Sequence, residues 1–102
     1  IDELYYKRAP AEYLPYEYNR FDVVICTHVL EHVRNLDKAI SELKRVARRK
    51  LIIVTPRQRP YFYTLDLHLH FFPDKDMLTE RIGLKNFICI NVGGDWYYEA
   101  DL

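Results

Sequence analysis

Apolar and polar positions repeat with different periods along this 102-residue chain. Near-continuous apolar runs at residues 21–26 and 51–55 predict two buried β-strands, because a parallel strand covered on both faces has few polar positions. Between these runs, apolar residues recur at helical spacing through residues 36–49, and Asn35 stands where a helix N-cap is expected. The order strand, helix, strand predicts a βαβ unit with two parallel strands.

Weaker patterns on either side predict the remaining elements. Residues 4–7 are a candidate for a short strand. Residues 73–82 predict a second helix, with Gly83 as the residue that follows its end. Two strands joined by a glycine-containing turn complete the chain as a hairpin, namely residues 86–92, Gly93-Gly94-Asp95 and residues 96–100.

Composition and charge fit a single globular domain. Hydrophobic residues make up 49% of the chain, enough for a packed core. Fifteen basic and fifteen acidic residues cancel, so no net charge draws the chain to nucleic acid or to an anionic membrane. Cys26 and Cys89 both lie in predicted strands, as reduced thiols do in proteins of a reducing compartment. No apolar run is long enough to span a membrane. These features predict a cytoplasmic protein.

A polar cluster follows the first apolar run directly. Thr27 and His28 end the run, and Glu31 and His32 come within the next turn. Open α/β sheets bind ligands outside the carboxyl ends of their strands. The sequence therefore predicts a ligand site where this strand ends.

Several short motifs, taken in order, resemble the class I S-adenosylmethionine-dependent methyltransferases, and most closely their small-molecule, type 11-like group. The resemblance covers nearly the whole chain from the family's third strand onward. It rests on five motifs: Ala11-Glu12-x-Leu14-Pro15, Phe21-Asp22-Val23-Val24, Leu30-Glu31-His32, Glu42-Leu43-x-Arg45-Val46 and His68-x-His70-Phe71.

This resemblance implies a fold, a cofactor and a reaction. The implied fold is a Rossmann-like three-layer α/β sandwich, with a mostly parallel sheet and an antiparallel last strand. The implied cofactor is S-adenosylmethionine, and the implied reaction is methyl transfer to a small-molecule acceptor. Ala11, Glu12, Thr27 and His28 align with cofactor-binding positions, although Pro10 replaces the Asp or Asn that is common before the first two. No catalytic residue and no metal ligand is assigned.

The first half of the family's pattern is missing from this chain. The three glycines, Gly83, Gly93 and Gly94, all lie near the C-terminus, so the family's glycine-rich turn has no counterpart. We therefore interpret residues 1–102 as a partial methyltransferase domain, inactive by itself, with an exposed edge at the 21–26 strand. Such an edge favours self-association. The alternative is a non-catalytic protein-interaction module derived from the same fold.

Two further readings of the histidines remain open. His28, Glu31 and His32 fall at positions i, i+3 and i+4, and some methyltransferases of this kind bind a divalent metal through such a Glu-His pair and a downstream His, here His70. A histidine of this group is also a candidate general base, because imidazole accepts a proton near neutral pH. The residues alone choose neither reading.

The connection at residues 56–72 is long and rich in aromatic and basic residues. Long connections inside compact domains often act as lids, so we expect this one to face the substrate. Its segment at residues 57–63 mixes cations with aromatic rings, as single-stranded nucleic-acid sites do, but the zero net charge argues against that partner.

Overall fold

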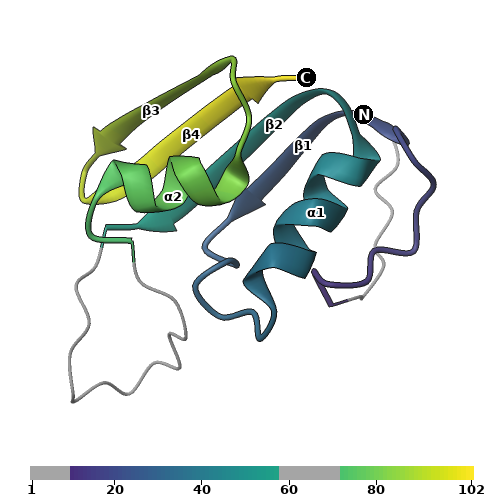
Figure 1. Cartoon of the computed structure of the whole chain (residues 1–102), viewed down its shortest axis with the longest axis horizontal. Helices are drawn as coiled ribbons and strands as arrows, with labels where there is room; N and C mark the ends of the chain where they lie inside the picture. The colour runs from purple at the N-terminus through teal and green to yellow at the C-terminus, as the bar shows by residue number, and fades with distance from the viewer. Residues whose placement is uncertain (1–9, 58–71) are drawn as a thin grey trace, which may run out of the picture.

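A computed structural model describes residues 10–57 and 72–102, which form an α/β unit with four strands and two helices. The elements follow one another in the predicted order (Figure 1). Their bounds are β1 Phe21–Thr27, α1 Leu36–Val46, β2 Ala47–Pro56, α2 Lys75–Ile82, β3 Phe87–Val92 and β4 Asp95–Asp101. The candidate strand at residues 4–7, the pair His68 and His70, and most of the predicted lid lie outside the described residues.

The four strands form one mixed sheet in the order β1-β2-β4-β3. β1 and β2 are parallel, and β4 is antiparallel to both of its neighbours. Three strands therefore share one direction and only the last strand is reversed, as the sequence predicted. In Figure 1 the arrowheads of β1, β2 and β3 point to the same end of the sheet. Among the described strands β1 lies at an edge, which also agrees with the prediction.

Helix α1 begins as the sequence predicted but ends earlier. The Asn35 side chain accepts a hydrogen bond from the Lys38 backbone N–H at 3.1 Å, which satisfies one free donor of the first turn. The apolar spacing predicted a helix as far as Arg49, whereas the helix ends at Val46. Residues 47–50 belong instead to β2, because they pair with β1 from Phe21 and with the end of β4. Pairing with distant strands overrides the local helical pattern here.

The predicted glycines lie at the end of helix α2 and in the turn of the C-terminal hairpin. Gly83 has a left-handed backbone with a φ of 74°, and its N–H donates to the Thr79 carbonyl, which closes α2. Gly93 and Gly94 join β3 to β4 with φ values of 58° and 89°. Two successive positive φ values define the tight turn that matches the natural twist of a hairpin.

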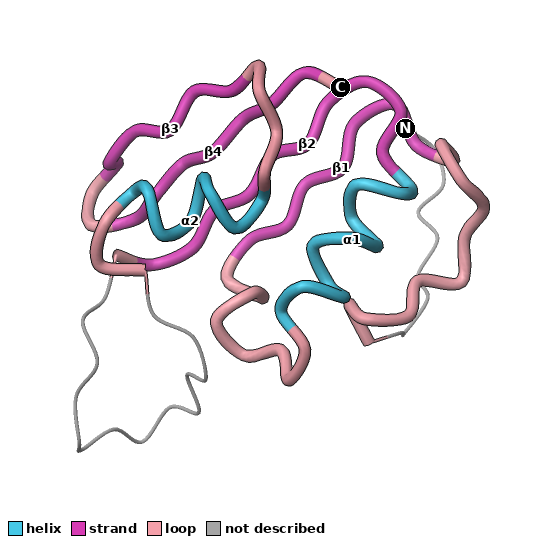
Figure 2. Tube along the Cα trace, viewed as in Figure 1, coloured by secondary structure: helices cyan, strands magenta, loops and turns pink. Residues whose placement is uncertain are grey.

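Both helices lie on the same face of the sheet (Figure 2). The core therefore lies between this covered face and the helices, and its members include Leu51, Ile53, Leu78 and Tyr98, all fully buried. The pairing register places alternate side chains of the same strands on the opposite face, which we call the open face. Its apolar members are Val23, Ile25, Ile52, Val54, Ile88, Ile90 and Val92.

The open face differs from the sequence prediction of fully buried strands. Val23, Ile25, Ile88, Ile90 and Val92 are exposed, and no described helix lies over them. The two helices supply one layer and the sheet another within the described residues.

None of the described helices has the length and apolar character needed to cross a bilayer.

Candidate functional site

The predicted ligand site lies where the carboxyl ends of β1, β2 and β3 meet. Because β4 runs in the opposite direction, its first residue, Asp95, lies at this same end of the sheet. Thr27 ends β1 and pairs with Val54 of β2, and Pro56 ends β2 opposite Asp95. The fold therefore gathers groups from three strands at one end of the sheet, as ligand-binding α/β sheets do.

His28 continues the β1–β2 pairing by one residue in an unusual conformation. Its backbone N–H donates to the Val54 carbonyl at 2.7 Å, while its φ is 53°. Few residues other than glycine adopt this left-handed region. The imidazole Nδ1 lies 3.6 Å from Glu31 Oε2, and Nε2 lies 3.5 Å from Asp95 Oδ2. His28 thus joins the end of β1 to the start of β4.

Glu31 is a buried carboxylate in the turn that follows β1. Its side chain is 2% exposed, and its Oε1 accepts a hydrogen bond from the Thr55 hydroxyl at 3.4 Å. Burial raises the pKa of the neighbouring Cys26 thiol to about 11, and the Glu31 charge adds to the rise. Cys26 therefore stays protonated at neutral pH and is a poor nucleophile. We call His28, Glu31, Thr55 and Asp95 the carboxyl-end cluster.

Arg57 and Trp96 hold the hairpin against the end of β2. The Arg57 backbone N–H donates to Gly94 at 2.9 Å, and its guanidinium carbon lies 5.4 Å from the centre of the Trp96 ring. The Trp96 indole N–H in turn donates to the Phe72 carbonyl at 2.7 Å. These contacts fix the turn that positions Asp95.

Ala11 and Glu12, predicted to contact the cofactor, are the central residues of a turn. The Tyr13 N–H donates to the Pro10 carbonyl at 3.0 Å and closes it. Tyr13 lies beside the first turn of α1, where the Lys38 ammonium is 5.6 Å from its ring. Because α1 starts near the end of β1, this turn lies at the same end of the domain as Thr27 and His28. Ala11 also packs against the core.

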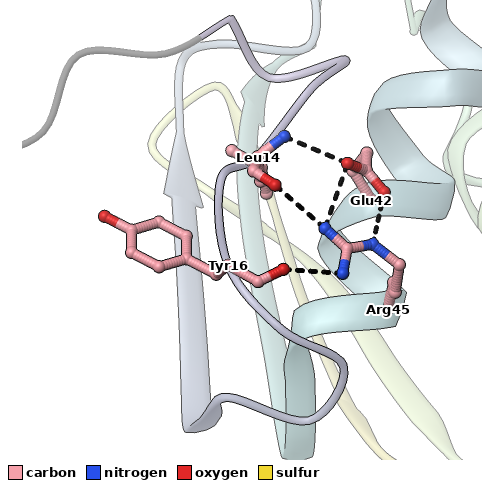
Figure 3. Close-up of polar contacts among 4 residues, drawn as sticks. All are labelled: Leu14, Tyr16, Glu42 and Arg45. Carbon is pink, nitrogen blue, oxygen red and sulfur yellow. Dashed lines mark hydrogen bonds and ion pairs between the residues drawn. The ribbon is translucent and has the colours of Figure 1, made fainter.

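A partly buried ion pair attaches this loop to α1 (Figure 3). Glu42 Oε1 accepts from the Leu14 N–H at 3.0 Å, and Arg45 donates to the Leu14 and Tyr16 carbonyls at 3.0 and 2.7 Å. Arg45 Nε also lies 2.6 Å from Glu42 Oε2. The hydrogen bond from Arg45 lowers the pKa of Glu42 from its ordinary value of 4.5, and the Leu14 N–H adds to this. We call this arrangement the Glu42–Arg45 clamp.

In the sequence, Glu42 and Arg45 were recognised only as parts of a motif, without a role. Their signal was a Glu and an Arg three residues apart, which places the two side chains together on a helix. That the pair would reach two backbone carbonyls about thirty positions upstream could not be read from this spacing.

The described residues do not gather a metal site. Glu31 is buried, whereas the adjacent His32 is exposed. Within residues 10–57 and 72–102, no group of three His, Cys, Asp or Glu side chains is placed to hold a metal ion. His70, the fourth member of that reading, lies outside the described residues.

Comparison with known families identifies the chain. The profile of the methyltransferase-domain family matches residues 2–54, which is just over half of the 102-residue chain. The matched region includes the loop with Ala11 and Glu12, the whole of β1 and α1, and most of β2. The chain therefore belongs to the methyltransferase-domain family.

Parts of the chain also resemble individual proteins and solved structures. An uncharacterized protein of Methanocaldococcus jannaschii is 48% identical over 44 residues, which cover 41% of this chain and 19% of that protein. The crystal structure of a SAM-dependent methyltransferase from Aquifex aeolicus superposes with a TM-score of 0.65 at 16% identity, over 93% of this chain and 52% of that one. The [4+2]-cyclase SpnF superposes with a TM-score of 0.62 at 20% identity, over 83% of this chain and 34% of that one.

These superpositions establish the Rossmann-like methyltransferase fold, since their identities are too low to carry more. The chain spans about half of the Aquifex protein and smaller shares of the other two.

Proposed function

We propose that this chain is the C-terminal part of an S-adenosylmethionine-dependent methyltransferase domain that methylates a small-molecule acceptor. The observation that carries the proposal is the family match over residues 2–54, which includes His28 and Glu31 of the carboxyl-end cluster. Cofactor and acceptor then meet at the carboxyl end of the sheet. Ala11, Glu12, Thr27 and His28 are the proposed cofactor contacts from this chain.

The charges at this end of the sheet suit the cofactor. Glu31 and Asp95 place two carboxylates around the end of β1, with the imidazole of His28 between them. A sulfonium cation is attracted to such a site more strongly than in water, because Glu31 is buried in a low-dielectric environment. The Glu42–Arg45 clamp holds Leu14 and Tyr16, which follow the turn at Ala11 and Glu12, so this part of the loop is ordered before a ligand arrives.

The chemistry of the bound cofactor is donation of its sulfonium methyl group to a nucleophile. The residues of this chain orient the two reactants. The end of β1 and the loop before it contact the acceptor and the methyl group from two sides. Holding the reacting atoms in line is the main catalytic requirement of a methyl transfer. The pairing of β1 with β2 holds the end of β1 rigidly, and the Glu42–Arg45 clamp holds the loop.

Calorimetric titration with S-adenosylhomocysteine tests the proposal on the protein that carries this chain. We expect binding that weakens about tenfold, or about 1.4 kcal/mol, in Glu12→Ala and in Thr27→Val. Tyr18→Ala is the matched control, because Tyr18 lies in the same loop and is 73% exposed. Absence of binding by the wild-type protein, or equal affinity in all variants, would contradict the proposal.

One observation favours the alternative of a non-catalytic interaction module. The open face presents exposed apolar residues on both edge strands of the sheet, namely Val23 and Ile25 on β1 and Ile88, Ile90 and Val92 on β3. Exposed apolar patches of this kind mark protein contacts. On that alternative, the protein fails to bind S-adenosylhomocysteine, and Ile25→Lys abolishes a concentration-dependent oligomer seen by sedimentation. Cofactor binding by a monomer would exclude it.

A further inference from the structure

The imidazole of His28 is placed between two carboxylates that come from distant parts of the chain. Glu31 follows β1, whereas Asp95 starts β4. The two ring nitrogens each face one carboxylate, at 3.6 and 3.5 Å. The His28 side chain is nevertheless 51% exposed, so one side of the ring remains open to a small molecule. These distances exceed those of a tight hydrogen bond, as catalytic contacts often do before substrate arrives.

The backbone holds the ring in this position. The positive φ of His28 is costly for a residue with a side chain, and it persists because the N–H is bonded to Val54 at 2.7 Å. Strained backbone of this kind is concentrated at functional sites, where it aims a side chain. Here it aims the imidazole from the end of β1 toward the turn between β3 and β4.

The two carboxylates differ in a way that fixes the proton on the ring. Glu31 is almost fully buried and is held by the Thr55 hydroxyl, whereas Asp95 is about one third exposed. A neutral imidazole donates only one hydrogen bond, and a buried carboxylate is the stronger acceptor because water does not compete for it. This difference favours the tautomer with the proton on Nδ1, toward Glu31, which leaves the free lone pair on Nε2.

We propose that His28 is the general base of the methyl transfer and that Glu31 is its positioning residue. This proposal rests on the proposed function and adds the class of acceptor, a small molecule whose nucleophilic oxygen or nitrogen still carries a proton at neutral pH. The acceptor atom forms a bond to the methyl carbon, and the sulfur–methyl bond breaks with its electrons passing to sulfur. The proton of the acceptor moves to Nε2, and Asp95 stabilises the resulting imidazolium. The exposed ring then returns the proton to water.

The charged and titratable groups around the ring are few among the described residues. Glu31 faces it from the turn after β1, and Asp95 faces it from β4. Thr55 of β2 donates a hydrogen bond to Glu31. Arg57, which follows β2, is bonded through its backbone N–H to Gly94, the residue before Asp95. Only a neutral ring accepts a proton, and the two carboxylates lie where they stabilise the positive charge that results.

The first test needs no acceptor. Nitrogen NMR of the imidazole in the protein that carries this chain should show the Nδ1–H tautomer for neutral His28, and Glu31→Gln should shift the ring toward Nε2–H. An Nε2–H tautomer in the wild-type protein would overturn the proposal. Because this measurement involves no cofactor, it is independent of whether the proposed function holds.

The second test measures transfer of a tritiated methyl group from S-adenosylmethionine to a small-molecule extract of the source cells. His28→Asn is the variant of choice because Asn tolerates a positive φ, and His28→Gly serves as a second variant with the same tolerance. We expect both variants to bind S-adenosylhomocysteine at most about tenfold more weakly, as for the other cofactor contacts, while transfer at saturating cofactor falls about 100-fold or more. The control His32→Gln removes an exposed imidazole from the same turn. Wild-type transfer by the His28 variants, or an equal loss in the control, would overturn the proposal.

Discussion

The two faces of the sheet are built from the same strands and both carry isoleucines, yet their surroundings differ. On the covered face, Ile53 has 0% of its surface exposed and packs beneath the helices. On the open face, Ile25 is 63% exposed and Ile90 is 52% exposed. Parallel strands with apolar residues on both sides normally have cover on both faces. The open face is therefore the part of the fold whose hydrophobicity the described residues do not account for.

The polar groups repeat this contrast. On the covered face, the Glu42–Arg45 clamp is largely buried and connects α1 to the loop before β1. On the open face, the Glu99 carboxylate accepts a hydrogen bond from the Tyr97 hydroxyl at 2.8 Å and lies 3.2 Å from Lys50 Nζ. Both side chains of this ion pair are partly exposed to solvent. The hydrogen bond from Tyr97, followed by that from Lys50, lowers the pKa of Glu99. An ion pair on the covered face should therefore contribute more to the free energy of unfolding than one on the open face, and substitutions measure this difference.

Shortening one isoleucine on each face tests the contrast most strongly. We expect Ile53→Ala to lower the free energy of unfolding by about 2–5 kcal/mol, because it leaves a cavity in the core. Ile25→Ala should cost about 1 kcal/mol or less, mainly through strand propensity. Urea unfolding of the 102-residue chain measures both. Equal costs would contradict the comparison by showing that Ile25 is covered.

Neutralising one carboxylate on each face should have a smaller effect. Glu42→Gln should cost about 2 kcal/mol, because it leaves Arg45 without its buried charged partner. Glu99→Gln should shift the urea midpoint less than Glu42→Gln does, and added salt should reduce the shift, as for exposed ion pairs. A larger loss from Glu99→Gln than from Glu42→Gln would reverse the proposed order of the faces.

The clamp also predicts a dependence of stability on pH. Because the folded-state pKa of Glu42 lies below its ordinary 4.5, its contribution is present above that value and is lost as the pH falls through the folded pKa. The difference in unfolding free energy between the wild type and Glu42→Gln should therefore shrink in acid. A difference that stays constant down to pH 3 would contradict this assignment.

The smallest expected effect concerns two adjacent tyrosines that point to opposite faces. The Tyr98 hydroxyl is buried with no hydrogen-bond partner among the described residues, and burial raises the pKa of Tyr98 to about 12. Tyr98→Phe should leave stability unchanged or raise it by up to about 1 kcal/mol, because an unsatisfied hydroxyl is removed. Tyr97→Phe, which loses a bond to Glu99, should lower stability slightly. Thermal unfolding that shows Tyr98→Phe as the more harmful change would reveal a hydroxyl partner.

Local signals in the sequence predicted most of the fold. Asn35 marked the start of α1, Gly83 the end of α2, and Gly93 and Gly94 the hairpin, because each of these positions depends only on its neighbours in the chain. The start of β2 at Ala47 was not predicted. It depends on pairing with Phe21 and on the ion pair of Arg48 with Asp22 at 2.9 Å, and neither is visible in a helical pattern.

The candidate site was predicted only in part for the same reason. The cluster after β1 followed from an apolar strand that ends in Thr27 and His28. The participation of Asp95 did not, because it comes from reversal of the last strand at the hairpin turn. A carboxylate in a tight turn has an ordinary local role in sequence, so only the folded arrangement shows that it faces His28.

Backbone-amide NMR of the protein that carries this chain, with and without S-adenosylhomocysteine, tests most directly where the cofactor binds. We expect the signals that move to belong to the carboxyl end of the sheet, including Ala11, Glu12, Thr27 and His28, while those of Ile88 and Ile90 on the open face stay in place. No shifts, or shifts confined to the open face, would contradict the claim that this end of the sheet binds the cofactor of a methyltransferase.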